Sequence, residues 1–343
     1  MIQIYGTIGP NCRTQDIFES MLHEGMNGIR LNLSHGSLQL NSSVIRAYAD
    51  ACRTLHVPQC IMIDLHGPEQ RVGVLEQPIV LQPGDYVKLQ LEDFRGDRPF
   101  LPLPAPILHA LSPEDRLLIH DGSISLQVCS VPENTSAQTT GLFCRTLRGG
   151  TVKSNLSVKI EGKEIYGPVL TEEDLANLKA AKSLGITSVM QPFVRSGKDI
   201  QLVRSALHEY GIHAKIFAKI ESLEGYNHLD SIIRESDVIV IARGDLGQAV
   251  SLWELPVLQK KIAAQCRACK KPFMVVTQML ESMISSPVPT RAEVSDIFNA
   301  VLDGASYLMV TGETAVGQYP DLVIHYLKKT TAEAEQYLAE QTE

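Results

Sequence analysis

Eight short apolar segments, rich in β-branched residues, recur along the chain, and a helical pattern follows each of them except where about 100 residues interrupt the series. Continuous apolar runs of this length are typical of parallel strands that are buried on both faces. Three strand–helix units precede the interruption and five follow it, so the sequence predicts an α/β fold, a closed (β/α)8 TIM barrel. The expected strands cover residues 2–7, 27–34, 59–65, 186–191, 214–220, 237–242, 272–277 and 306–311.

The interrupting segment has a different pattern, in which apolar and polar residues alternate at the period of a half-exposed strand. Residues 85–91 and 123–128 show this alternation, and Pro-Gly and Asp-Gly turns separate such segments. We therefore expect a small β-barrel-like domain over residues 68–167, inserted after the third strand. The barrel domain would comprise residues 1–67 and 168–343.

Composition limits the classes of ligand and partner. Hydrophobic residues make up 44% of the 343 residues and charged residues 20%, which is ordinary for a globular protein with a sizeable core. A formal net charge of −8 without a basic run argues against nucleic acid as a partner, so an anionic ligand must be attracted locally.

The lack of a signal-peptide pattern and the usage of cysteine both favour the cytoplasm. The N-terminus has no signal-peptide pattern and no run is apolar enough for a membrane span. Seven scattered cysteines, an odd number, fit free thiols in a reducing compartment. Cys266 and Cys269 form a lone Cys-x-x-Cys pair, and no second pair accompanies it to complete a zinc site. We expect a cytoplasmic protein with no membrane partner.

Two of the expected strands end in charge. The segment Ile216-Phe-Ala-Lys-Ile-Glu221 places Lys219 and Glu221 two residues apart, so both side chains point to the same side of the strand. Asp245 follows the next strand beside Gly244, where a loop can bring backbone close to a ligand. An ammonium beside two carboxylates at neighbouring strand ends suits a divalent metal that holds a phosphate. A buried ion-pair network is the alternative.

The second expected strand carries three polar residues at alternate positions. Arg30, Asn32 and Ser34 would share one face of a buried strand, where polar groups are costly unless they bind something. Asp64, at the end of the third strand, could join Asn32 and Ser34 in an all-oxygen site for a hard monovalent cation. Arg30 would then remain for a phosphate oxygen. A hydrogen-bonded barrel layer with a structural arginine is the alternative.

Further candidates lie beyond other strand ends. The Asp245-Leu-Gly247 turn could lead into a short helix whose backbone N–H groups bind a carboxylate. Gly312-Glu-Thr314 follows the eighth strand, where barrels often hold phosphates. Thr277 ends the seventh strand, and its hydroxyl could cap the next helix or take part in catalysis. A solvated imidazole is favoured for His120, whereas the sequence leaves His66 undecided.

The same residues belong to an ordered set of motifs that resembles the pyruvate kinase family. The resemblance covers nearly the whole chain, including the inserted domain, and the ordered set is far more specific than any one motif. The motifs are Thr7-Ile-Gly-Pro10, Gly25-Met-Asn-Gly-Ile-Arg-Leu-Asn-Leu-Ser-His-Gly36, Met62-Ile-Asp64, Gly67-Pro-Glu69 with Arg71, Phe193-Val-Arg195, Ala218-Lys-Ile-Glu221, Ala242-Arg-Gly-Asp-Leu-Gly247, Thr277-Gln-Met-Leu-Glu-Ser-Met283, Pro289-Thr-Arg-Ala-Glu293 and Gly312-Glu-Thr-Ala315.

This resemblance implies a reaction and roles within it. The reaction would move a phosphoryl group between phosphoenolpyruvate and ADP, giving pyruvate and ATP. Lys219 would stabilise the phosphoryl group in flight, and Arg30 would bind the phosphate. Thr277 would line the side from which the enolate is protonated, and Gly244 and Asp245 would contact the substrate.

The resemblance also implies two metal ions and a nucleotide site. Glu221 and Asp245 would hold Mg²⁺ or Mn²⁺. His35 and Arg71 would approach the nucleotide phosphates, with the inserted domain closing as a lid. Glu69 resembles the residue of potassium-dependent members, so K⁺ is expected as a second cofactor. The implied K⁺ ligands are Asn32, Ser34, Asp64 and the carbonyl of Leu65.

The chain departs from the family pattern in several places. The usual Asp-Thr-Lys-Gly-Pro is Asp64-Leu-His-Gly-Pro68 here, and the Ser before Gly-Glu-Thr is Thr311. An Ala-Ser-Phe whose serine normally lies near the catalytic lysine is Gln191-Pro-Phe193, and the Leu-Pro-Gly region of the inserted domain is Lys159-Ile-Glu-Gly162. The family usually has a large C-terminal domain after the barrel, where effectors bind and subunits meet, whereas this sequence stops at the eighth barrel helix. We therefore expect no effector regulation and a reduced oligomer interface, with a homo-oligomer as a possible partner arrangement.

The residues that would bind the metal ion and the phosphoryl group match the family pattern, whereas some of the residues expected around them differ from it. This pattern favours a metal-dependent phosphotransferase of pyruvate kinase type, acting on phosphoenolpyruvate and ADP or on a close relative of that pair. One alternative keeps the metal and enolate sites but performs other enolpyruvate chemistry on a modified substrate, without a nucleotide. Another is a catalytically weak protein that binds a metabolite and regulates a partner.

Overall fold

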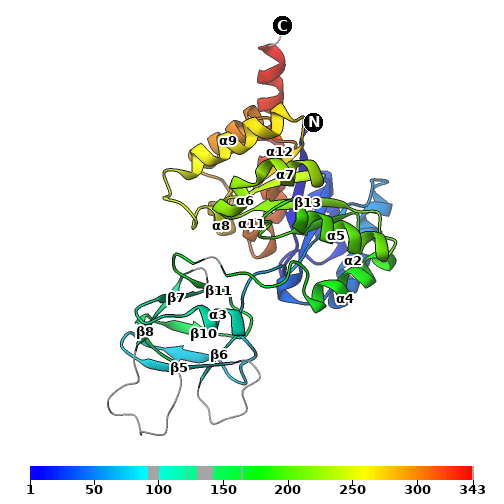
Figure 1. Ribbon diagram of the computed structural model, residues 1–343. Coiled ribbons are helices and arrows are strands. Elements are labelled where there is room, and N and C mark those ends of the chain that lie inside the picture. Colours follow the sequence, from blue (N-terminus) through cyan, green and yellow to red (C-terminus); the bar gives the residue numbers. More distant parts are fainter. Residues whose placement is uncertain (92–99, 121, 130–141, 164, 342–343) are drawn as a thin grey trace, which may run out of the picture. The chain divides into compact units, whose positions relative to one another are not determined.

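The computed structural model describes residues 1–91, 100–120, 122–129, 142–163 and 165–341, and it forms two compact units (Figure 1). The first unit comprises Met1–Gly67 and Val169–Glu343. The second unit, Pro68–Pro168, is inserted between these two stretches. The insertion follows the third strand of the first unit, as the change of sequence pattern predicted.

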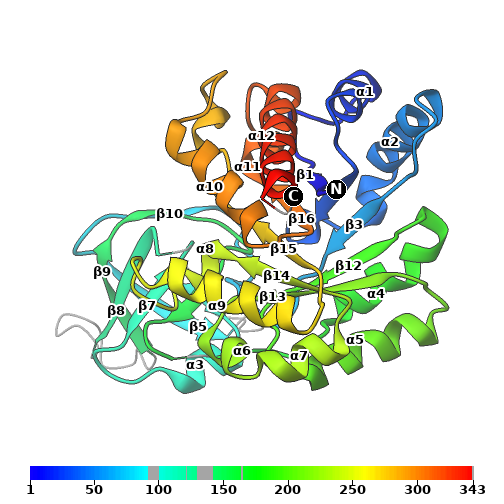
Figure 2. The same ribbon diagram turned by 90° about the horizontal axis from the view of Figure 1, so that it is seen from above.

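Eight parallel strands of the first unit close into a barrel, in the order β1-β16-β15-β14-β13-β12-β3-β2 (Figure 2). The predicted TIM barrel is therefore confirmed, and each strand lies within its expected range. The strands are β1 Gln3–Thr7, β2 Gly28–Asn32, β3 Ile61–Asp64, β12 Ser188–Gln191, β13 Lys215–Ile220, β14 Val238–Ala242, β15 Phe273–Val276 and β16 Tyr307–Val310.

Helices connect the strands and pack around the outside of the barrel (Figure 2). The longer ones are α1 Gln15–His23, α2 Ser42–Thr54, α4 Glu172–Ala181, α5 Gly197–Glu209, α7 Leu229–Glu235, α9 Leu255–Ala268, α10 Arg291–Leu302 and α12 Pro320–Glu340. Shorter turns of helix lie between these elements: η1 Leu33–His35, η2 Gln39–Asn41, η3 Lys182–Leu184, α6 Leu223–Asn227, α8 Arg243–Leu246, η4 Glu281–Ile284 and α11 Gly312–Ala315.

Alternate residues of the barrel strands fill two different apolar layers. One layer lies between strands and helices and forms the larger core of this unit. The other fills the inside of the barrel, and four of its members are methionines, whose flexible thioethers suit irregular gaps. Because this inner layer is apolar, inward-facing polar groups are confined to the strand ends. The inner layer comprises Tyr5, Met62, Met190, Phe217, Val238, Val240, Ala242, Met274, Val276 and Met309.

The inserted unit is built from β-strands around an apolar core of its own. Its strands form a six-stranded sheet in the order β11-β7-β8-β9-β5-β6 and a two-stranded sheet of β10 and β4. The two segments with predicted alternation correspond to β5 and β8. The elements are β4 Ile79–Leu81, β5 Tyr86–Leu91, β6 Leu101–Leu103, α3 Ala105–Ala110, β7 Arg116–Ile119, β8 Ile124–Cys129, β9 Leu142–Arg148, β10 Gly150–Val152 and β11 Val158–Ile160.

One buried carboxylate fixes the two barrel segments that adjoin the insertion. Asp174 forms a capping box with Thr171 at the start of α4. The same carboxylate accepts hydrogen bonds from the backbone N–H groups of His66, at 2.8 Å, and Gly67, at 3.1 Å. The last residues before the insertion are thereby attached to the first helix after it.

A second capping box explains one of the sequence motifs. At the start of α10, Thr290 caps the backbone N–H of Glu293, and the Glu293 carboxylate bonds the backbone N–H of Thr290 at 2.7 Å. Glu293 also accepts from the backbone and hydroxyl of Ser282, at 2.8 and 2.6 Å. The Pro289-Thr-Arg-Ala-Glu293 motif therefore joins α10 to the loop that follows β15.

We predict that Glu293→Gln lowers the free energy of unfolding by about 1 kcal/mol at pH 7, because charge-assisted bonds to backbone N–H groups are lost. Partial burial raises the pKa of Glu293, but the bonds from Ser282 and Thr290 lower it below its usual 4.5. The stabilisation is therefore present above pH 4.5 and is lost as the pH falls through the folded-state pKa. Thermal melts of both proteins from pH 7 to pH 4 measure this.

A matched control is Glu333→Gln, which removes an exposed glutamate of α12. It should leave the melting temperature unchanged over the same range of pH. A Glu293→Gln protein as stable as this control at pH 7 would contradict the assigned role.

Candidate functional site

Charged side chains from strands that are not adjacent meet at the C-terminal end of the barrel. Lys219 of β13 lies 3.2 Å from Asp64 of β3 and 3.1 Å from Glu221, measured from Nζ to carboxylate oxygens. Strand β12 separates β3 from β13, so the ammonium reaches over β12 to the aspartate. The prediction that Lys219 and Glu221 point to the same side of their strand is confirmed.

Asp64 is the acceptor that the two cations of this cluster share. Arg30 donates to its Oδ2 from Nη2 at 2.5 Å and from Nε at 3.2 Å, and Lys219 donates to the same oxygen. The other oxygen, Oδ1, is buried and has no hydrogen-bond partner among the described residues. One carboxylate thus carries two cations on one oxygen and leaves its second oxygen available.

Burial and neighbouring charges set the protonation of the cluster. Burial raises the pKa of Asp64, but Lys219 and Arg30 lower it more, so the net pKa lies below the usual value. Burial lowers the pKa of Lys219, but Asp64 and Glu221 raise it well above the usual value. Both groups are therefore charged at neutral pH. Burial raises the pKa of Glu221 to about 7, opposed by Lys219 and reinforced by the charge of Asp245.

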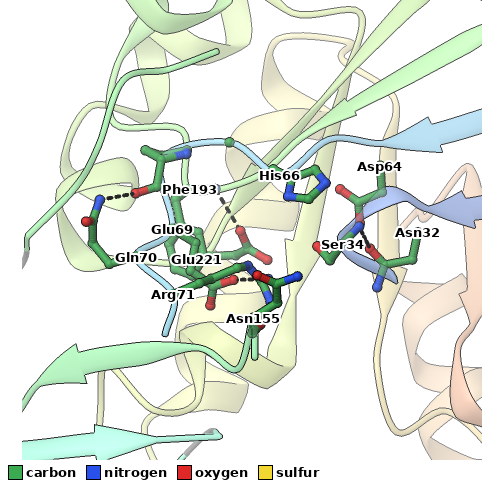
Figure 3. A network of polar contacts seen from close by, with 12 residues as sticks. Asn32, Ser34, Asp64, His66, Glu69, Gln70, Arg71, Asn155, Phe193 and Glu221 are labelled. Atoms are coloured by element: carbon green, nitrogen blue, oxygen red, sulfur yellow. Dashed lines mark hydrogen bonds and ion pairs between the residues drawn. The ribbon is translucent and has the colours of Figure 1, made fainter. Parts of the chain in front are cut away.

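The two predicted metal-binding carboxylates belong to neighbouring strand ends. Glu221 is buried and oriented by the backbone N–H of Phe193, which donates to its Oε2 at 2.7 Å (Figure 3). Asp245 lies within α8, so the short helix expected to follow Asp245 begins two residues before it. The charge of Asp245 acts on the pKa of both Lys219 and Glu221.

The polar residues after β2 correct one expectation. Ser34 does not continue the strand, because β2 ends at Asn32 and the chain turns into η1. The Asn32 side chain causes this turn by accepting the backbone N–H of Ser34 at 3.2 Å. Asn32 is nevertheless in register with Asp64, and Figure 3 shows Asn32, Ser34 and Asp64 as neighbours. Leu65, the fourth implied ligand, continues directly from Asp64.

Thr277 lies in a strained loop just beyond β15. Its φ is +80° and that of Gln278 is +54°, a backbone region that β-branched residues rarely adopt. The guanidinium of Arg243 donates to the Thr277 carbonyl from Nε and Nη2, at 3.1 and 2.7 Å. The hydroxyl does not cap α10, whose cap is Thr290.

Glu313 contacts the same loop and has a different role from the one its motif suggested. Its carboxylate is fully buried and accepts the backbone N–H groups of Met279 and Leu280, both at 3.1 Å, and of Thr311 at 2.6 Å. The hydroxyl of Thr314 donates to the carbonyl of Thr7 at 2.8 Å. The side chains of the Gly312-Glu-Thr314 motif thus bond the protein itself.

The remaining candidates are three histidines and Arg71. The imidazole of His66 lies 3.7 Å from the carboxylate of Glu173, and His120 is exposed, as favoured for a solvated imidazole. The backbone of His35 ends η1, but its side chain is outside what the structure describes. Within the inserted unit, Arg71 forms an ion pair with Glu69 and donates to the carbonyl of Asn155 (Figure 3).

The donor set distinguishes between kinds of metal. Throughout the described ranges, no group of three or more His, Cys, Asp or Glu side chains is arranged to hold a metal ion. Cys266 and Cys269 are free thiols. Glu221 and Asp245 are carboxylates, the kind of ligand through which Mg²⁺ or Mn²⁺ binds while keeping water and substrate oxygens.

A closed (β/α)8 barrel with charged groups gathered at the C-terminal strand ends defines a barrel enzyme. Residues 1–324 match the sequence model of the pyruvate kinase barrel domain. The pyruvate kinase of Chlamydia trachomatis is 36% identical over 336 residues, 97% of this chain and 68% of that protein. The pyruvate kinase of Corynebacterium efficiens is 36% identical over 335 residues, 97% of this chain and 69% of that protein.

A solved structure agrees with these matches. A pyruvate kinase from Cryptosporidium parvum is 33% identical and superimposes with a TM-score of 0.82, covering 98% of this chain and 69% of that one. The chain therefore belongs to the pyruvate kinase family, as the ordered motifs indicated. Across the described residues, every helix is too short or too polar to cross a membrane.

We predict that Asp64→Asn lowers the free energy of unfolding by about 3–5 kcal/mol, because it leaves Arg30 and Lys219 buried without their shared carboxylate. Urea denaturation at neutral pH measures the loss. The control is Asp50→Asn, which breaks an exposed pair with Arg53 and should cost less than about 1 kcal/mol. Equal losses in the two variants would show that Asp64 does not stabilise the two cations.

Proposed function

We propose that the protein transfers a phosphoryl group between phosphoenolpyruvate and ADP, giving pyruvate and ATP. One observation carries this proposal: Lys219, whose side chain is 14% exposed, lies at the barrel mouth between Asp64 and Glu221, which keep its ammonium charged. A fixed positive charge in a dry site stabilises the negative charge that is spread over a phosphoryl group in transfer. Membership of the pyruvate kinase family supports the same reaction.

Arg30 would bind the phosphate beside Lys219. Its Nε and one terminal nitrogen are held by Asp64, which fixes the plane of the guanidinium. The other terminal nitrogen lies 3.4 Å from the hydroxyl of Thr7, a long contact that a phosphate oxygen could replace. Arg30 and Lys219 would thus position the phosphate before any chemistry takes place.

Glu221 and Asp245 would hold Mg²⁺ or Mn²⁺, and the ion would neutralise phosphate charge. The backbone N–H of Phe193 donates to one oxygen of Glu221 and thereby fixes the orientation of the carboxylate. Gly244 and Asp245 would contact the substrate beside this ion. Thr277 would line the side from which the enolate is protonated.

Potassium would lie among Asn32, Ser34, Asp64 and the carbonyl of Leu65. The buried Oδ1 of Asp64 supports this site, because buried carboxylate oxygens are rarely left without a partner. Hard oxygen donors of this kind suit an alkali cation. His35 and Arg71 would approach the nucleotide phosphates, and the inserted unit that carries Arg71 would act as a lid.

We predict that the purified protein converts phosphoenolpyruvate and ADP to pyruvate and ATP in the presence of Mg²⁺ and K⁺, with both products measured. Lys219→Met should lower kcat by at least about 100- to 1,000-fold, because the charge at the transferred group is lost. Lys179→Met, which removes an exposed lysine of α4, is the control and should keep wild-type turnover.

Absence of either product with the wild-type protein would reject the proposed reaction. Pyruvate formed without ADP would instead indicate enolpyruvate chemistry that needs no nucleotide. Wild-type turnover in Lys219→Met would reject the role of the lysine alone.

We predict higher turnover in KCl than in NaCl at equal ionic strength, because Glu69 resembles the residue of potassium-dependent members of the family. Replacing Asn32 by Leu should remove most of the difference between the two salts, because one donor is lost. Initial rates over a range of both salts measure the effect. Equal rates of the wild-type protein in KCl and NaCl would exclude the potassium assignment.

A further inference from the structure

We infer that Arg243 is the positioning residue for Thr277 and that it links the metal-binding side of the site to the side where the enolate is protonated. This inference rests on the proposed function. Arg243 lies two residues before Asp245, so its backbone belongs to the metal-binding side. Its side chain extends to the loop after β15, where Thr277 lies.

The loop needs support because its backbone is strained. Thr277 and Gln278 are two consecutive non-glycine residues with positive φ, a conformation that costs folding free energy. The conformation is less favourable for Thr277 than for Gln278, because positive φ is especially rare for β-branched residues. Such a conformation persists only where surrounding groups fix it, and strained backbone of this kind is concentrated at functional sites.

Arg243 supplies this support through hydrogen bonds from its side chain to carbonyl groups of the loop. Its side chain is only 10% exposed, and it makes two bonds to the carbonyl of Thr277 and one, at 3.2 Å, to that of Gln278. Its remaining terminal nitrogen lies 2.6 Å from Asp296 of α10. The planar guanidinium is therefore held at one end by a carboxylate and presents its other edge to the strained carbonyls.

Glu313 holds the next two residues of the loop through their N–H groups. A cation on the carbonyls and an anion on the amides thus fix four consecutive residues, 277–280. The side chain of Thr277 packs onto Gly244, because a Cβ added to Gly244 would lie 3.2 Å from the Thr277 methyl group. Arg243 therefore determines where the Thr277 hydroxyl lies relative to the metal-binding turn.

The test separates two parts of the reaction. Formation of ATP from phosphoenolpyruvate and ADP reports phosphoryl transfer, and exchange of the methyl hydrogens of pyruvate with deuterated solvent reports proton transfer at the enolate. Arg243→Lys keeps the charge but cannot make the parallel bonds to one carbonyl. We expect it to slow methyl exchange at least tenfold, to slow ATP formation less, and to leave the melting temperature within a few degrees.

Two comparisons separate positioning from general damage. In a Thr277→Ala background, Arg243→Lys should slow exchange no further, because both changes remove the same function. Arg204→Lys is the matched control, since Arg204 also bonds a backbone carbonyl, that of Glu235, and an aspartate, Asp237. Asp237 precedes β14, at the opposite end of the barrel from the strand ends that carry the site. This control should leave both rates unchanged.

Wild-type exchange in Arg243→Lys, or full additivity with Thr277→Ala, would overturn the inference while leaving the proposed reaction intact. Equal losses of exchange and ATP formation would also overturn it. If the wild-type protein formed ATP but showed no methyl exchange, the role of Thr277 and this inference would both fail. Absence of both activities in the wild-type protein would reject the proposed function itself.

Discussion

The contact between Lys219 and Asp64 is the interaction on which the rest of the site depends. It joins two strands that are not neighbours, because the Lys219 side chain reaches over β12, which lies between β13 and β3. Two buried charges are stable when each has a partner and further hydrogen bonds, and here Arg30 and Glu221 provide them. The order of the strands in the barrel therefore determines which charged side chains meet.

Much of this architecture could be predicted because its signals are local. Buried parallel strands are short apolar runs, and a charge at the end of such a run marks the open end of the sheet. Alternation within a strand was enough to put Lys219 and Glu221 on one side. The same reasoning failed at Ser34, because alternation holds only while the strand continues, and the Asn32 side chain ends β2 by bonding the next turn.

The remaining features depend on contacts between residues far apart in the sequence. The side-chain partners of Arg243 lie 34 or more residues away, and two of the three residues that bond the Glu313 carboxylate, Met279 and Leu280, are 34 and 33 residues away. The positive φ of Thr277 and Gln278 could not be predicted from their residue types, because glycine is the residue that normally indicates a positive φ. The sequence thus located the motif after β16 but not its partner, which is the loop that carries Thr277.

Asp174 has a mechanical consequence for the inserted unit. Its carboxylate binds the backbone at His66 and Gly67 and also caps α4, so the exit from the barrel and the return to it share one anchor. Asp64 lies only two residues upstream of His66, so the carboxylate that holds both chain ends at the insertion also restrains the backbone next to the charge cluster.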